Sequence, residues 1–287
     1  MATSYFRKIL IPTDFSPIAN NAMNHGLALA EKSGAKVTLL HAYALPIILD
    51  ENGQIVNARD LTNDLTSAAE HELLVLKKEI AISHPKLVID YIQLEGSLVH
   101  EVEHICKEKH IDLVVMGTKG SSQFDEYMVG SNTALVLEDV KCPILVIPEN
   151  ATVAPYKKIL YATDFQFDDV EILVRLMEFA DLFGATIEVV HISKEPRKDE
   201  EILESLRKIC FDRIKYTNIS FSNIVENNST LQTLNNLIQA KGIDLVSMSS
   251  TGKGFLKKLF TGSMTKKMAY QTSIPFMAFH VRRDNHL

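Results

Sequence analysis

The sequence predicts an α/β protein with two repeated, doubly wound parallel sheets of five strands each, a Rossmann-like arrangement. Short apolar runs rich in β-branched residues, such as Ile111–Val115, alternate with longer segments of helical character. This alternation is typical of a parallel sheet covered by helices. The pattern also occurs twice, because Lys8–Phe15 returns as Lys158–Phe165 and Ile111–Val114 returns as Ile243–Val246.

The two copies are related by a shift of 150 positions near their starts and of 132 positions near their ends. The difference of 18 positions is an extra segment of the first copy, between His41 and Asp112. A duplication of about 140 residues indicates two domains rather than a short-period solenoid. We expect a first domain at residues 1–148, a second at 157–287, and a linker at 149–156 that contains Pro155.

Apolar runs and helix signals place the elements of the first copy. After a strand at Arg7–Pro12, a helix has Ser16 as N-cap, Pro17 in its first turn and Gly34 just past its end. The extra segment Ala42–Leu61 contains a turn signal at Asp50–Gly53. The remaining expected elements are strands at Lys36–His41, Leu87–Leu94, Leu113–Met116 and Pro143–Ile147, and helices at Asn63–Ser83, Ser97–Lys109 and Ser131–Val140.

Composition narrows the class of protein. With 287 residues and 46% hydrophobic content, the chain is long enough for two domains of ordinary size. A net charge of −6 predicts no general attraction to nucleic acid or to an anionic membrane. The three cysteines have no Cys-x-x-Cys spacing, and neither a signal peptide nor an apolar run near ~20 residues is evident. We therefore expect a soluble cytoplasmic protein.

A glycine motif stands where a buried strand gives way to a helix. Met116-Gly117-Thr118-Lys119-Gly120 follows the strand, and after nine residues Gly130-Ser131-Asn132-Thr133 opens the helix. Glycine lets the backbone approach a ligand closely, and a helix N-terminus offers free N–H groups with the positive end of its dipole. The combination suits a phosphate, although the glycines could also form only a β–α turn.

The spacing Gly-x2-Gly-x9-Gly-Ser resembles the nucleotide-binding signature of the universal stress protein family. Ile9-Leu10-Ile11-Pro12-Thr13-Asp14 is similar to that family's first strand and its aspartate. The resemblance implies the strand order 3-2-1-4-5 in each copy. In such a sheet, ligands bind beyond the carboxyl ends of the strands where the order reverses, here between strands 1 and 4.

The resemblance also implies a ligand, ATP with Mg²⁺ at its phosphates, and a set of residues that hold it. Asp14 could alternatively be a turn residue that binds its own backbone, and Lys119 a solvated surface lysine. The implied residues are Pro12, Thr13 and Asp14 at the adenine and ribose, Ala42 at the adenine edge, Met116 and Gly117 along the nucleoside, and Lys119, Gly120, Gly130, Ser131 and Asn132 at the phosphates.

The second copy departs from this motif. Ser249 replaces Gly117, Ala162 replaces Pro12 and Met264 replaces Asn132, whereas Asp164, Gly252, Gly262 and Ser263 are kept. A β-carbon at Ser249 obstructs the close approach of a ligand, so we expect the second site to be weakened or empty. The loop of the second copy contains five lysines, at 253, 257, 258, 266 and 267. They could give this site residual anion binding, or they could form only a solvated basic face.

A rival motif, His100-Glu101-Val102-Glu103-His104, matches the His-Glu-x-x-His zinc pattern, with His110 as a potential third ligand. The protease pattern requires glycine where Lys107 stands, and the second copy keeps neither histidine of the pair. A solvated helix face with His110 near the left-handed position is the favoured interpretation; adventitious metal binding stays open. No catalytic or metal-binding residue is assigned, and we interpret His41 and His191 as strand-end histidines bound by backbone.

The apolar strands at 142–147 and 274–279 are sheet edges that would invite pairing. We expect them to form an internal pseudo-dimer, with a homodimer as an alternative. The favoured function is a nucleotide-dependent sensor or adaptor of the stress response with an unidentified protein partner, in which nucleotide orders the loop from Gly120 to Gly130. The alternatives are slow ATP hydrolysis, phosphoryl transfer to Ser121 or Ser122, and a structural stress protein with vacant sites.

Overall fold

The computed structural model describes residues 6–44, 48–49, 55–56, 59–118, 130–153, 155–165, 169–195, 199–213, 216–226, 229–250 and 274–280. The elements of the first half are β1 (Lys8–Pro12), α1 (Pro17–Ser33), β2 (Lys36–Tyr43), β3 (Ile48–Leu49), β4 (Ile55–Val56), α2 (Arg59–Ser83), β5 (Ile89–Glu95), α3 (Leu98–Lys109), β6 (Leu113–Gly117), α4 (Ser131–Asp139) and β7 (Ile144–Ile147). Those of the second half are β8 (Lys158–Thr163), α5 (Asp169–Phe183), β9 (Thr186–Ser193), α6 (Glu200–Arg213), β10 (Ile219–Val225), α7 (Thr230–Lys241), β11 (Leu245–Ser250) and β12 (Phe276–His280).

The predicted helix caps are present. The Ser16 hydroxyl accepts a hydrogen bond from the backbone N–H of Ala19, and Gly34 ends α1 in the left-handed conformation with φ of 70°. At the end of α3, His110 adopts the same left-handed conformation with φ of 52°, as does Gly242 after α7. The helix ends are therefore set by local signals that recur in both copies.

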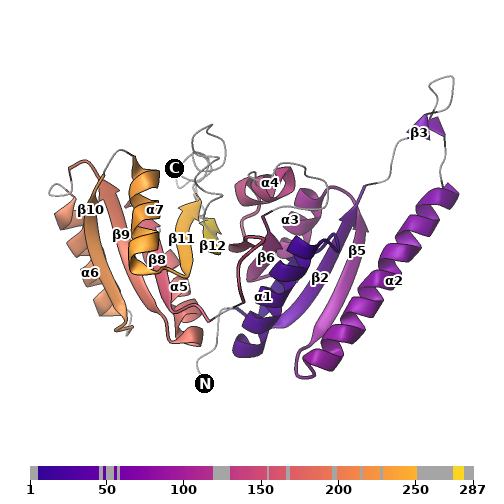
Figure 1. The fold of residues 1–287 in the computed structure, drawn as a ribbon, viewed down its shortest axis with the longest axis horizontal. Helices are drawn as coiled ribbons and strands as arrows, with labels where there is room; N and C mark the ends of the chain where they lie inside the picture. The colour runs from indigo at the N-terminus through magenta and orange to yellow at the C-terminus, as the bar shows by residue number, and fades with distance from the viewer. Residues whose placement is uncertain are drawn as a thin grey trace.

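Each half contains five parallel strands in the order third, second, first, fourth, fifth, which confirms the predicted fold class and strand order. The two halves form one ten-stranded sheet, because β7 and β12 pair antiparallel at its centre (Figure 1). Met277 lies opposite Leu145 in this pairing. The expected internal pairing through the fifth strands is thus confirmed.

Helices cover both faces of the sheet, and the hydrophobic core runs through both halves on each face. On one face, Phe6 of the first half packs edge-on against Phe179 of α5, with ring centroids 5.7 Å apart. On the other face, Val136 of α4 and Leu234 of α7 belong to one buried cluster. Because residues of both halves share these buried clusters, the joint between the halves is part of the hydrophobic core. Burying one large apolar side chain stabilises a fold by about 1.5–3 kcal/mol.

The extra segment of the first half forms a short antiparallel hairpin, β3 and β4, which extends beyond the end of the sheet in Figure 1. The helix that follows it, α2, begins at Arg59, four residues before the expected start. The expected turn at Asp50–Gly53 lies outside the described residues. No helix in the described part of the chain has the length and apolar character needed to cross a membrane.

Candidate functional site

Two predicted segments meet at the carboxyl edge of the first half of the sheet. Strand β1 pairs in parallel with β6, with Ile9 opposite Leu113, so the residues after each strand emerge at the same edge. The strand order reverses between β1 and β6, since the chain continues to β2 on one side and to β7 on the other. This is the point at which open α/β sheets bind ligands.

The N-terminus of α4 is fixed to the end of β6. The backbone N–H of Gly130 donates to the carbonyl of Thr118 at 2.7 Å, and the Thr133 hydroxyl donates to the carbonyl of Gly117 at 2.9 Å. Gly130 is the N-cap and supplies no side chain to cap the helix. The first-turn N–H groups of α4 are therefore oriented towards the same edge as the residues that follow β1.

The sequence-predicted residues differ in exposure. Asp14 and Ala42 are half-buried, and Ser131 and Asn132 are exposed at the start of α4. Lys119 and Gly120 lie outside the described residues. Pro12, Thr13, Met116, Gly117 and Gly130 are buried, so these residues would meet a ligand mainly through backbone atoms.

Asp14 and His41 both bind backbone in the structure. One carboxylate oxygen of Asp14 accepts from the N–H of Ser16 at 3.1 Å, which is the turn interaction weighed for this residue. Nδ1 of His41 lies 2.9 Å from the carbonyl of Thr13, and His191 makes the same contact with Thr163 at 2.9 Å. The interpretation of both histidines as strand-end residues bound by backbone is confirmed.

Phe15 marks the same edge of the sheet and was not predicted from sequence. It has a positive φ of 63°, and Phe165 in the second half has a φ of 59°. This conformation is strained for a bulky residue and tends to occur at functional sites. Each ring packs on the strand-end histidine, Phe15 on His41 at 4.8 Å and Phe165 on His191 at 4.0 Å between centroids. The signal available in the sequence was the triplet Thr-Asp-Phe, present in both copies.

Gly117 is required by the packing of α1, in addition to its predicted role in the close approach of a ligand. A β-carbon built at this position would lie 2.6 Å from Cγ2 of Ile18 and 3.3 Å from the carbonyl oxygen of that residue. The glycine thus allows α1 to approach the end of β6.

The second half carries a buried polar network beneath its corresponding edge. Asp169, at the first turn of α5, is 2% exposed and accepts hydrogen bonds from the hydroxyls of Tyr161 and Thr163. Ile11 and Ala19 occupy the positions of Tyr161 and Asp169 in the first half. Ser249 is also buried here, whereas the second glycine-containing loop, the lysines around it and Met264 lie outside the described residues.

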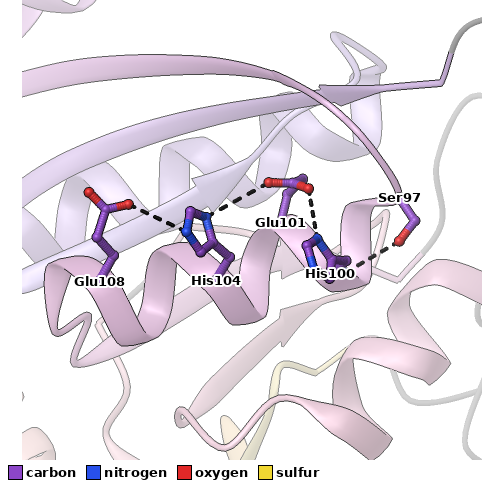
Figure 2. A network of polar contacts seen from close by, with 5 residues as sticks. All are labelled: Ser97, His100, Glu101, His104 and Glu108. Atoms are coloured by element: carbon purple, nitrogen blue, oxygen red, sulfur yellow. Dashed lines mark hydrogen bonds and ion pairs between the residues drawn. The ribbon is translucent and has the colours of Figure 1, made fainter.

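The two histidines of the motif are exposed on α3, on either side of the buried carboxylate of Glu101 (Figure 2). Nδ1 of His100 lies 2.8 Å from Glu101, and His104 lies 4.0 Å from Glu101 and 3.9 Å from Glu108. The side chains of His100 and His104 are 74% and 55% exposed. No group of three or more metal-ligating side chains occurs among the residues that the structure describes.

The comparisons with known proteins agree with this architecture. The sequence profile described as the Universal stress protein family matches residues 5–148. Universal stress protein Slr1230 of Synechocystis is 21% identical over 299 residues, which cover 95% of this chain and 99% of that protein. Universal stress protein MJ0531 of Methanocaldococcus jannaschii is 27% identical over 142 residues, which cover 50% of this chain and 82% of that protein. The crystal structure of a universal stress protein from Archaeoglobus fulgidus matches with a TM-score of 0.75 and 18% identity, covering 98% of this chain and 99% of that one, which shows a shared fold.

Proposed function

The chain belongs to the universal stress protein family, and we propose that its first half binds ATP at the carboxyl edge of β1 and β6. On this proposal the protein is a nucleotide-dependent sensor or adaptor of the stress response. The second half serves as its structural partner across β7 and β12, with a weakened or empty site of its own.

One observation carries the proposal. The residues after β1, the end of β6 and the uncapped N-terminus of α4 lie at one edge of the sheet, where the strand order reverses. Asp14 and Ala42 are accessible to a ribose and an adenine, and Ser131 and Asn132 are accessible to phosphates. Neutral backbone donors at a helix N-terminus suit the charge of a triphosphate.

Mg²⁺ fits this set of groups as a companion of the phosphates. It retains several waters and takes few protein ligands when it binds with a nucleotide. The hydroxyl of Ser131 and the amide oxygen of Asn132 are the accessible oxygen donors at the start of α4. The ion would reduce the negative charge of the phosphates, and the α4 N–H groups would orient them.

The nucleotide content of the purified protein tests the proposal. We expect denaturation to release about one adenine nucleotide per chain, identified by chromatography and mass spectrometry, with zinc measured on the same sample. A sensor returns intact ATP after hours of incubation, whereas slow hydrolysis or phosphoryl transfer to Ser121 or Ser122 returns ADP. No nucleotide, even after ATP is added, would refute the proposal.

A matched pair of substitutions locates the site. Gly130→Leu places a bulky side chain at the N-cap of α4 and should abolish nucleotide binding, because it obstructs the approach to the helix N-terminus. Gly262→Leu makes the same change at the equivalent position of the second copy and should leave binding unchanged. Retained binding in Gly130→Leu would show that the assigned site is wrong.

A further inference from the structure

The three cysteines of the chain are free thiols, and two of them lie together. Cys106, near the end of α3, is partly exposed, whereas Cys142, just before β7, is buried. The two are far apart in the sequence, yet both line one pocket of the structure. Cys210 is buried in α6 of the second half and belongs to a different cluster of the core.

The chain after α3 brings the first two cysteines into contact. The backbone N–H of Ile111 donates to the carbonyl of Cys106 at 3.1 Å. The thiol of Cys142 donates to the carbonyl of Ile111 at 3.3 Å. The side chains of Cys106 and Cys142 also share a hydrogen bond. Backbone and side-chain contacts therefore hold the two sulfur atoms as neighbours before any covalent bond joins them.

The internal repeat shows what else the same two positions can hold. A shift of 132 positions maps Cys106 to Ile238 and Cys142 to Ile274. Both isoleucines pack in the same hydrophobic cluster as the two cysteines. The second copy thus fills these positions with hydrocarbon, while the first copy carries an oxidisable sulfur at both. A buried cysteine can also serve as a small apolar side chain, so packing alone is the competing explanation.

The two thiols differ in the chemistry open to them. Contact with Cys106, together with burial, raises the pKa of Cys142, so Cys142 keeps its proton at neutral pH. Cys106 is the member of the pair that solvent reaches. Redox-sensing cysteines are accessible to solvent and often stand next to a second cysteine that resolves the oxidised sulfur. The arrangement therefore suits Cys106 as the thiol that meets an oxidant and Cys142 as the resolving thiol.

We propose that Cys106 and Cys142 form a redox-active pair, which hydrogen peroxide converts to a disulfide within the chain. In the first step the Cys106 thiolate attacks one oxygen of the peroxide. An S–O bond forms, the O–O bond breaks, and the departing hydroxide takes up a proton to become water. In the second step the sulfur of Cys142 attacks the sulfenic sulfur of Cys106. The S–S bond forms, the S–O bond breaks, and the oxygen leaves as water with the proton of the Cys142 thiol.

The balance of the reaction is two thiols oxidised to one disulfide and one peroxide reduced to two molecules of water. Disulfides of this kind are transient in a reducing compartment, where thiols reverse them. The bond would fix the end of α3 to β7, the strand through which the two halves of the sheet are joined. Oxidation is thus recorded at the joint of the molecule, away from the carboxyl edge of β1 and β6.

Peptide mapping of the unaltered protein tests the proposal. The folded protein is treated with hydrogen peroxide at pH 7, alkylated with iodoacetamide and digested with trypsin without reduction. We expect the peptide of Cys106 joined to that of Cys142, and a fall from three free thiols per chain to one, which dithiothreitol reverses. Cys210→Ser should still form this disulfide, whereas Cys106→Ser should keep both of its remaining thiols.

Two trapping experiments test the order of the steps. Dimedone, which captures sulfenic acids, should label Cys106 in Cys142→Ala and should leave Cys142 unlabelled in Cys106→Ala. In the unaltered protein, N-ethylmaleimide should alkylate Cys106 about ten-fold or more faster than Cys142, because only Cys106 is accessible.

Three outcomes would overturn the proposal. They are over-oxidation of Cys106 to the sulfinic acid while Cys142 stays a free thiol, a disulfide between two chains on a non-reducing gel, and a linkage that involves Cys210. Each would show that Cys106 and Cys142 are neighbours for packing alone. None of these measurements depends on a bound nucleotide, so failure of ATP binding with the disulfide still formed would refute the proposed function alone.

Discussion

Gly117→Ala tests whether the glycine at the end of β6 is required by packing, independently of any ligand. The new β-carbon would lie 2.6 Å from Cγ2 of Ile18, well inside the 3.5–4.0 Å of an ordinary carbon contact. Overpacking of this kind costs about 1–3 kcal/mol. Because Ile18 is half-buried and can shift, we expect a loss of about 1–2 kcal/mol in the free energy of unfolding of nucleotide-free protein.

Urea denaturation followed by circular dichroism measures this loss, and each kcal/mol also lowers Tm by about 2–4 °C in a protein near this size. Ile18→Ala removes the clashing methyl group, so the double variant should lose about 1 kcal/mol less than the sum of the single variants. Ser249→Ala, at the equivalent position of β11, is the control that retains a β-carbon there. If Gly117→Ala unfolds at the wild-type urea concentration, the packing argument is wrong and the glycine serves ligand approach alone.

Three further outcomes follow from buried groups. Asp169→Ala should lower the free energy of unfolding by about 2–4 kcal/mol in urea denaturation, because it removes a buried carboxylate that accepts hydrogen bonds from the hydroxyls of Tyr161 and Thr163; a loss below 1 kcal/mol would contradict this. Leu145→Ala should cost about 2–5 kcal/mol and shift one calorimetric transition for the whole protein, whereas a shift in only one of two transitions would show independent halves. Burial lowers the pKa of His25 from its ordinary value of 6.5, so the unfolded chain binds its proton first and stability falls as the pH drops below about 6.5. Between pH 7 and pH 5, His25→Asn should therefore lose less stability than the wild type; an equal loss would exclude His25 as a source.

The sequence was sufficient for the fold because local and repeated signals agree. Ser16 and Gly34 cap α1 as predicted, and the apolar fifth strands pair at the centre of the sheet. The hairpin of β3 and β4 was not predicted, because strands of two residues are too short to show an alternating pattern. The start of α2 at Arg59 was also missed. Boundaries elsewhere differ by a few residues at most.

The candidate site was predictable in part. The described members of the predicted set lie at one edge of the sheet, where the strand order implied by the family resemblance and the positions of the strand ends place them. The positive φ of Phe15 and the contact of Gly117 with Ile18 depend on how α1 packs on β1 and β6, which no single segment specifies. The burial of the Asp169 carboxylate was likewise not predictable from one segment. It requires two hydroxyl donors, Tyr161 and Thr163, which lie two positions apart in β8.

The asymmetry of the two halves follows from the way a tandem chain is connected. Two separate copies related by a twofold axis would have identical grooves on either side of the β7 and β12 joint. In one chain a single linker connects the end of β7 to β8, and Asn21 and His25 hold it in one groove. The described residues include no such peptide in the equivalent groove of the second half. Glu171 and Arg175 have replaced the linker-binding pair there, while Asp169 and Ser249 alter the second crevice from within. Covalent linkage thus allows the two halves to differ, which agrees with our placement of the nucleotide in the first crevice alone.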